Sequence, residues 1–103
     1  MADKDINVSV SSSGVVSVDR PSVELKKGLD QAKWNVSVTG LEKMTITNKA
    51  DGAVIASCSG NGSSQACSCK SKTFDAVGTV SYMVTVRVSG VDHELDPDLI
   101  IKP

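Results

Sequence analysis

Three cysteines and one histidine are the residues of this chain with the widest chemical repertoire. Cys67 and Cys69 stand two positions apart, and Cys58 precedes them across the apolar-free segment SGNGSSQ. If residues 66–70 form a strand, both thiols point to one face, and a hairpin brings Cys58 close to one of them. Three thiolates and His93 would then offer a tetrahedral site for Zn(II).

The same cysteines have two other interpretations. A disulfide from Cys58 to Cys67 or Cys69 would close a loop of about ten residues, which stabilises by about 2 to 3 kcal/mol in the chain-entropy model. Such bridges persist mainly in exported proteins. We favour three reduced thiols, because the cysteine count is odd and the spacing is not that of a known zinc motif.

The run DHELDPD contains four carboxylates, those of Asp92, Glu94, Asp96 and Asp98. Ca(II) binds several oxygens, and loops of β-sandwich domains can supply them. The run lacks the residue order of an EF-hand loop, and Asp and Pro are common turn formers. We therefore expect residues 90–97 to form a solvated turn.

No residue pattern predicts catalysis. His93 lies in the expected polar turn, and no nucleophile motif surrounds its conceivable partners Cys67 and Ser68. Trp34 could stack on a sugar, but it alternates with Val36 and Val38, which favours a position in the core. We expect no catalytic residue and no enzyme activity.

The longest regular pattern extends from Thr79 to Gly90, in the sequence TVSYMVTVRVSG. Apolar side chains occupy every second position, as in a strand with one buried face, and β-branched residues favour this conformation. We therefore expect a central strand here. The apolar positions are Val80, Tyr82, Val84, Val86 and Val88.

Shorter alternating segments occur along the rest of the chain, separated by turn residues such as the Asp51-Gly52 pair and the run Ser11–Gly14, where we expect a turn. We find no segment with helical spacing, and we expect residues 59–65 to be a flexible connection. The pattern predicts one domain, residues 1–103, that is an all-β, two-sheet, mainly antiparallel sandwich of seven or eight strands. The other candidate segments for these strands are 6–10, 16–18, 23–25, 33–39, 43–47, 53–58, 66–70 and 99–102.

Two stretches resemble known β-sandwich families. The segment VSVDRPSVELKKGLDQAKWNVS resembles the first half of cupredoxin-like domains, with Trp34 in the entering strand. The end, GTVSYMVTVRVSGVDHELDPDLIIKP, is similar to small bacterial β-sandwich proteins. Immunoglobulin-like domains share much of this pattern of strands and turn residues. Blue-copper sites need two imidazoles and a thiolate, whereas this chain has only His93. The resemblance thus implies a scaffold without a copper site.

Composition excludes several classes of function. Eleven basic and twelve acidic residues nearly cancel, so the dense positive stripe of a nucleic-acid-binding protein is missing. No window is apolar enough for a membrane helix, and residues 1–10 do not form a signal peptide. We expect a cytoplasmic protein, or an exported one if a leader was removed.

We therefore expect a non-enzymatic binding or interaction module that has no cofactor and contacts a protein partner or a second copy. The alternative is a zinc or redox protein built on Cys58, Cys67, Cys69 and His93.

Overall fold

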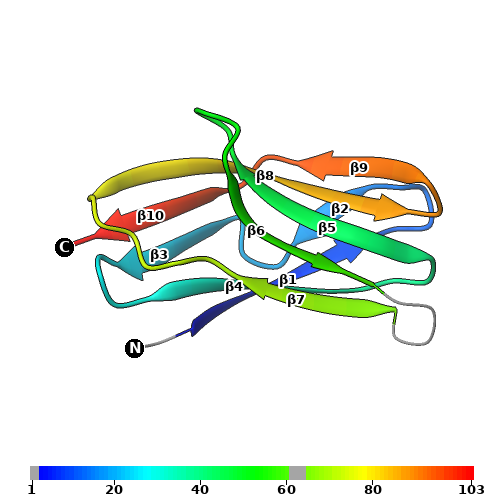
Figure 1. Cartoon of the computed structure of the whole chain (residues 1–103), viewed down its shortest axis with the longest axis horizontal. Coiled ribbons are helices and arrows are strands. Elements are labelled where there is room, and N and C mark those ends of the chain that lie inside the picture. Colours follow the sequence, from blue (N-terminus) through cyan, green and yellow to red (C-terminus); the bar gives the residue numbers. More distant parts are fainter. Residues whose placement is uncertain (1–2, 61–64) are drawn as a thin grey trace.

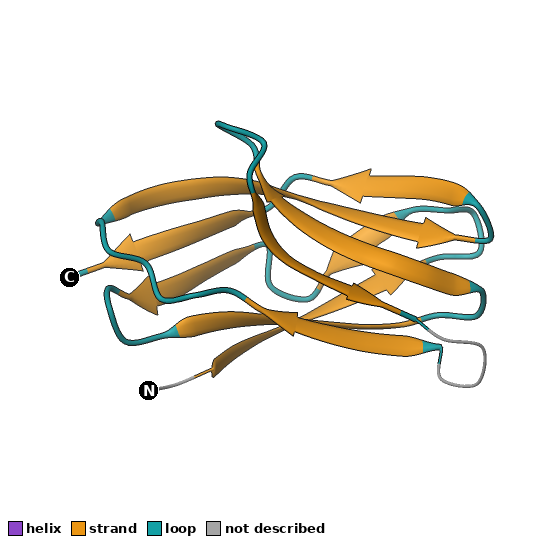
Figure 2. Cartoon of the chain, viewed as in Figure 1, coloured by secondary structure: helices purple, strands orange, loops and turns teal. Residues whose placement is uncertain are grey.

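The computed structural model describes residues 3–60 and 65–103, and within these residues it contains strands and loops but no helix (Figure 2). The predicted flexible connection at 59–65 lies partly outside the described residues. The strands are β1 (Asp3–Val10), β2 (Val16–Val18), β3 (Ser22–Lys26), β4 (Gln31–Ser37), β5 (Leu41–Asn48), β6 (Val54–Ser59), β7 (Ala66–Lys70), β8 (Gly78–Val88), β9 (Val91–Leu95) and β10 (Asp98–Lys102).

The first sheet has four strands in the order β2-β1-β4-β7. Ile6 of β1 pairs with Trp34 of β4, and both side chains are completely buried. Because strand side chains alternate, Asn7 and Asn35 beside them project from the opposite, outer face. The predicted core position of Trp34 is confirmed.

The second sheet has six strands in the order β3-β10-β8-β5-β6, with β9 also paired to β8. β8 is central, as the sequence predicts, because β5 lies along one edge while β10 and β9 follow each other along the other. Its residues Tyr82, Val84 and Val86 are fully buried against the first sheet. The two sheets form the predicted sandwich (Figure 1).

The expectation of a solvated turn at residues 90–97 is wrong. A tight turn occupies only Ser89 and Gly90, which both have positive φ, and Val91–Leu95 then forms β9 against β8. This strand lies at an edge and carries three polar residues in five, so its apolar alternation is weak. Pro97 separates β9 from β10. The described part of the chain therefore has ten strands rather than seven or eight.

Among the described residues, six of the eight strand pairings are antiparallel, which agrees with the predicted arrangement. The two parallel pairings join β1 to β4 and β3 to β10. β1, β4 and β8 end at the same end of the sandwich (Figure 1). The connections that follow these strands, residues 11–15, 38–40 and 89–90, therefore lie close together. Nowhere in residues 3–60 or 65–103 is there a helix with the length and hydropathy of a membrane span.

Candidate functional site

Cys58 and Cys67 form a disulfide that joins β6 to β7, with their Cα atoms 5.8 Å apart. These strands are the outermost members of the two sheets on one side. Cys58 pairs with Met44 and Cys67 with Val36, and these two partners are buried between the sheets. Both sulfur atoms therefore point into the same layer. The structure thus has one disulfide where three reduced thiols were favoured.

Cys69 is the third cysteine, and its thiol is free and buried. It pairs with Trp34 in the register of β4 and β7, two positions from Cys67 and on the same face. Burial raises the pKa of the Cys69 thiol to about 11. Because the thiolate is the nucleophile in thiol chemistry, Cys69 is poorly suited to exchange with the neighbouring disulfide.

Of the four residues predicted to bind zinc, the three cysteines lie on β6 and β7, which the disulfide joins, and His93 lies apart from them on β9. Cys58 and Cys67 are bonded to each other, whereas His93 lies on β9 against Gly14. Among residues 3–60 and 65–103, no three His, Cys, Asp or Glu side chains are grouped so that they could hold a metal ion. Zinc binding by these four residues stays a prediction, and it applies to the reduced chain.

The four carboxylates of the run DHELDPD do not converge on one point. They are distributed along β9, the connection after it and the start of β10, and each has its own neighbour. The contacts are Asp92 to Arg87 (3.6 Å), Glu94 to Thr85 (3.5 Å), Asp96 to Lys49 (3.3 Å) and Asp98 to Ser81 (2.9 Å).

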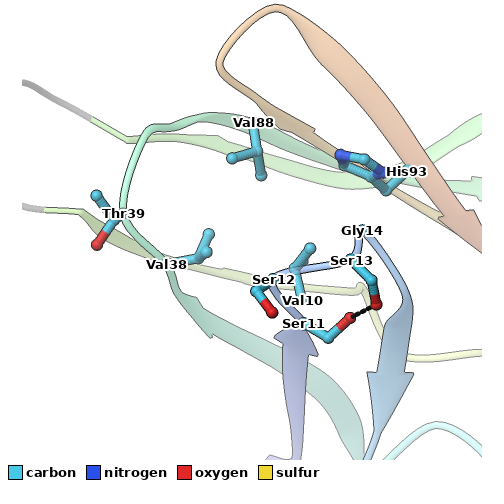
Figure 3. A pocket seen from close by; sticks show the side chains of 9 residues that line it. All are labelled: Val10, Ser11, Ser12, Ser13, Gly14, Val38, Thr39, Val88 and His93. Carbon is cyan, nitrogen blue, oxygen red and sulfur yellow. Dashed lines mark hydrogen bonds between the residues drawn. The ribbon is translucent and has the colours of Figure 1, made fainter.

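A cleft of about 420 Å³ lies at the end of the sandwich where β1, β4 and β8 end (Figure 3). We call it the end cleft. The side chains of Val10, Val38 and Val88 point into it, and the imidazole ring of His93 borders one side (Figure 3). The lining residues are Val10, Ser11, Ser12, Ser13, Gly14, Val38, Thr39, Val88 and His93.

His93 faces the interior because it pairs with Val86, whose side chain points between the sheets. Its ring lies against Gly14 in the loop between β1 and β2. A Cβ atom at Gly14 would be only 2.8 Å from Cε1 of His93, and Gly14 has a φ of +86°. Both the backbone conformation and the contact therefore require glycine at this position.

The loop over the end cleft is held by its own hydrogen bonds. The backbone N–H of Ser11 donates to the carbonyl of Val15 (2.9 Å), and the N–H of Gly14 donates to the carbonyl of Ser11 (2.9 Å). The N–H of Val15 donates to the Ser11 hydroxyl (3.0 Å). The predicted turn at Ser11–Gly14 is confirmed, and it forms a fixed wall of the cleft.

The imidazole of His93 has unused hydrogen-bonding capacity in the end cleft. Among the side chains drawn in Figure 3, the dashed line marks the hydrogen bond between the hydroxyls of Ser11 and Ser13 and does not involve His93. No lining residue is Asp, Glu, Lys or Arg. His93 is thus the titratable group of a cleft whose other inward-pointing side chains are valines. The pattern Val91-x-His93-x-Leu95 was the signal that could have placed His93 inward.

The conceivable catalytic partners of His93 are located elsewhere. Cys67 is in the disulfide. The hydroxyl of Ser68 donates to Oδ1 of Asn35 (2.7 Å) on the outer face of the four-stranded sheet. Trp34 cannot be a stacking platform, because none of its surface is exposed.

The two packed sheets and the end cleft define a small β-sandwich domain. No protein-family model and no curated protein sequence matches this chain. Among solved structures, a mutant of amicyanin in its reduced Cu(I) form at pH 4 is similar. The TM-score is 0.52 at 18% identity, over 99% of this chain and 86% of that chain. This likeness shows that the chain has a cupredoxin-like fold.

The copper ion implied by this fold family does not fit the residues present. A mononuclear blue-copper site needs two imidazoles and a thiolate. This chain has one histidine, and the free cysteine of the described residues, Cys69, is buried on β7 while His93 lies on β9. The fold is therefore shared without this donor set.

Proposed function

We propose that this protein is a non-enzymatic binding module and that the end cleft is its ligand site. The observation that carries the proposal is the inward-facing imidazole of His93, which has no hydrogen bond to the other residues that line the cleft, while three valines supply its apolar surface. Binding sites for small ligands are commonly apolar hollows of about 300 to 1,000 Å³ with a few polar groups that orient the ligand. The end cleft has a volume in this range, and its lining combines valines with hydroxyl groups and one imidazole.

The scaffold around the end cleft supports a preformed site. Val10, Val38 and Val88 belong to strands or connections at the end of the packed core, and the loop at Ser11–Gly14 is hydrogen-bonded internally. Sites carried by rigid elements need little ordering when a ligand binds, which preserves affinity. The ligand can be a small molecule or the end of a partner protein.

The disulfide supports a role in an oxidising compartment, where such bonds persist. The alternative of a zinc or redox protein has less support. Two of its four residues, Cys58 and Cys67, are bonded to each other. The raised pKa of Cys69, about 11, leaves little thiolate for exchange at neutral pH.

A fragment screen followed by two-dimensional NMR tests the proposed function. We expect fragments that bind to shift the amide signals of Gly14 and Val88. The matched variants are His93→Ala, which removes the polar group of the cleft, and Ser17→Ala, which alters an exposed residue of β2 outside it. Binding should weaken in the first and be unchanged in the second. Shifts confined to other surfaces would contradict the proposal.

A further inference from the structure

We infer that the end cleft accommodates a small carboxylate with a short branched aliphatic body, and that the imidazolium form of His93 is its counter-ion. The inference rests on the proposed function, because it names the class of ligand for the same cleft. It is carried by two features of the lining, the three inward-pointing valines and the absence of an acidic partner for His93.

The apolar part of the ligand follows from the three valines. Three valine side chains point into the end cleft (Figure 3): Val10 from β1, Val38 from the connection after β4, and Val88 from β8. Valine side chains favour an aliphatic partner, because removing apolar surface from water is favourable. The volume of about 420 Å³ is near the lower limit of small-molecule sites. A body of a few carbon atoms fits within this volume, and no lining residue is Phe, Tyr or Trp.

The charge of the ligand follows from the surroundings of His93. None of the residues that line the end cleft is acidic. On its own strand, Asp92 and Glu94 alternate with His93 and project from the outer face, where Asp92 contacts Arg87 of β8. The inward residues of β8 beside His93 are Val86 and Val88.

The other elements packed against His93 provide no counter-ion either. The loop 11–15 and β2 (Val16–Val18) contain no titratable residue. A protonated His93 is therefore a charge without an acidic partner, at the edge of a cleft lined by valines and hydroxyl-bearing residues. A carboxylate ligand would supply the missing partner, and charge-assisted hydrogen bonds are stronger than neutral ones.

The sign of the pH dependence follows from this pairing. A histidine imidazole changes its charge between about pH 5 and 8. The imidazolium donates from both nitrogens and attracts an anion, so a carboxylate binds more tightly at the lower pH. An alcohol that donates to neutral imidazole shows the opposite dependence, and a cationic ligand is repelled at the lower pH.

The experiment compares three probes of similar shape by NMR titration of the full chain at about pH 5.5 and about pH 8. Isobutyrate is the anion, isobutyramide the neutral isostere and isopropylamine the cation. We expect isobutyrate to shift Gly14 and Val88 with a dissociation constant about tenfold lower than that of isobutyramide at the lower pH. This advantage should disappear at the higher pH.

Two variants show whether His93 is the cause. His93→Gln should reduce isobutyrate binding to the level of isobutyramide and abolish its pH dependence, while Ser17→Ala should change neither. The indole N–H signal of Trp34 reports that each variant keeps the folded core. An unchanged isobutyrate affinity in folded His93→Gln would overturn the role of His93.

The remaining outcomes separate the two proposals. Binding of isobutyramide in the end cleft that is as tight as that of isobutyrate overturns the carboxylate inference and leaves the proposed function in place. If none of the three probes shifts Gly14 or Val88, the carboxylate inference fails. The proposed function then fails as well if the fragment screen also leaves these two signals unchanged.

The carboxylate can belong to a free acid or to the C-terminus of a peptide. The tripeptide Gly-Gly-Val and its C-terminal amide distinguish these sources. Tighter binding of the tripeptide than of isobutyrate assigns a peptide end, and the reverse assigns a free acid. In either case the amide must bind more weakly than the tripeptide, because equal binding of the two would overturn the inference.

Discussion

The indole N–H of Trp34 in the four-stranded sheet donates a hydrogen bond of 3.2 Å to the hydroxyl oxygen of Tyr82 in the six-stranded sheet. The two rings meet edge to face, with centroids 5.3 Å apart and planes at 67°. Both side chains are fully buried. The largest residues of the core thus join the two sheets by a polar contact as well as by packing.

Replacing Tyr82 with Phe should lower the free energy of unfolding by about 1 to 3 kcal/mol, because the buried N–H of Trp34 loses its acceptor. Urea denaturation measures the change. The double variant Trp34→Phe and Tyr82→Phe should cost less than the sum of the two single changes, because neither side chain is then left unsatisfied. Additive costs would show that the hydrogen bond contributes nothing.

Breaking the Cys58–Cys67 disulfide should leave the fold intact but less stable. The bond spans a sequence separation of nine residues, for which the chain-entropy model predicts a loss of about 2 to 3 kcal/mol. Urea denaturation of the double variant Cys58→Ser and Cys67→Ser tests this. Cys69→Ala is the control that keeps the bond, and mass spectrometry verifies the disulfide in each protein. An unchanged unfolding midpoint in the double variant would show that the disulfide between β6 and β7 does not stabilise the fold.

Stability should fall in alkaline solution because of Cys69 and Tyr82. Burial raises the pKa of Cys69 from 9.0 to about 11 and that of Tyr82 from 10.0 to about 12. Each group holds its proton more tightly in the folded state, so its contribution is complete below the unfolded pKa and is lost as pH rises toward the folded value. Urea midpoints should therefore decline above about pH 9. The decline should be smaller in Cys69→Ala and in Tyr82→Phe.

Replacing Gly14 with Ala should displace His93 and destabilise the protein by about 1 to 3 kcal/mol. Gly52→Ala is the matched control, because Gly52 has a φ of +74° and no heavy atom within 4 Å of the added Cβ. Both variants share the backbone strain, and only the first adds the contact with the imidazole. NMR shifts of the His93 ring that are identical in the two variants would contradict this contact.

Acid should weaken the junction between Asp19 and Asn7. The carboxylate of Asp19 accepts hydrogen bonds from the backbone N–H (2.8 Å) and the side-chain amide (2.9 Å) of Asn7. The backbone hydrogen bond is the main cause that lowers the pKa of Asp19 below 3.8. Its stabilisation is therefore present above pH 3.8 and is lost as pH falls through the folded pKa. In acid titration followed by circular dichroism, Asp19→Ala should unfold at a higher pH than the unaltered protein. The control Asp75→Ala, at an exposed residue, should unfold at the same pH as the unaltered protein.

Part of the candidate site could be predicted from the sequence. The Ser11–Gly14 turn, the strand ending at Val10 and the long strand containing Val88 all follow from local patterns, and the structure confirms them. His93 was singled out for zinc or catalysis and assigned to a solvated turn. Its inward position depends on β9, whose edge location reduces the apolar alternation that marks a strand.

The sequence by itself determined the all-β class, the central position of β8 and the burial of Trp34, because the alternation of side chains across a strand is a local property of the chain. Tertiary structure decided that Cys67 rather than Cys69 bonds to Cys58, that β1 pairs with β4 in parallel, and that His93 lies against Gly14. These relationships join residues distant in sequence. They depend on how two sheets stack and end, which local spacing does not encode.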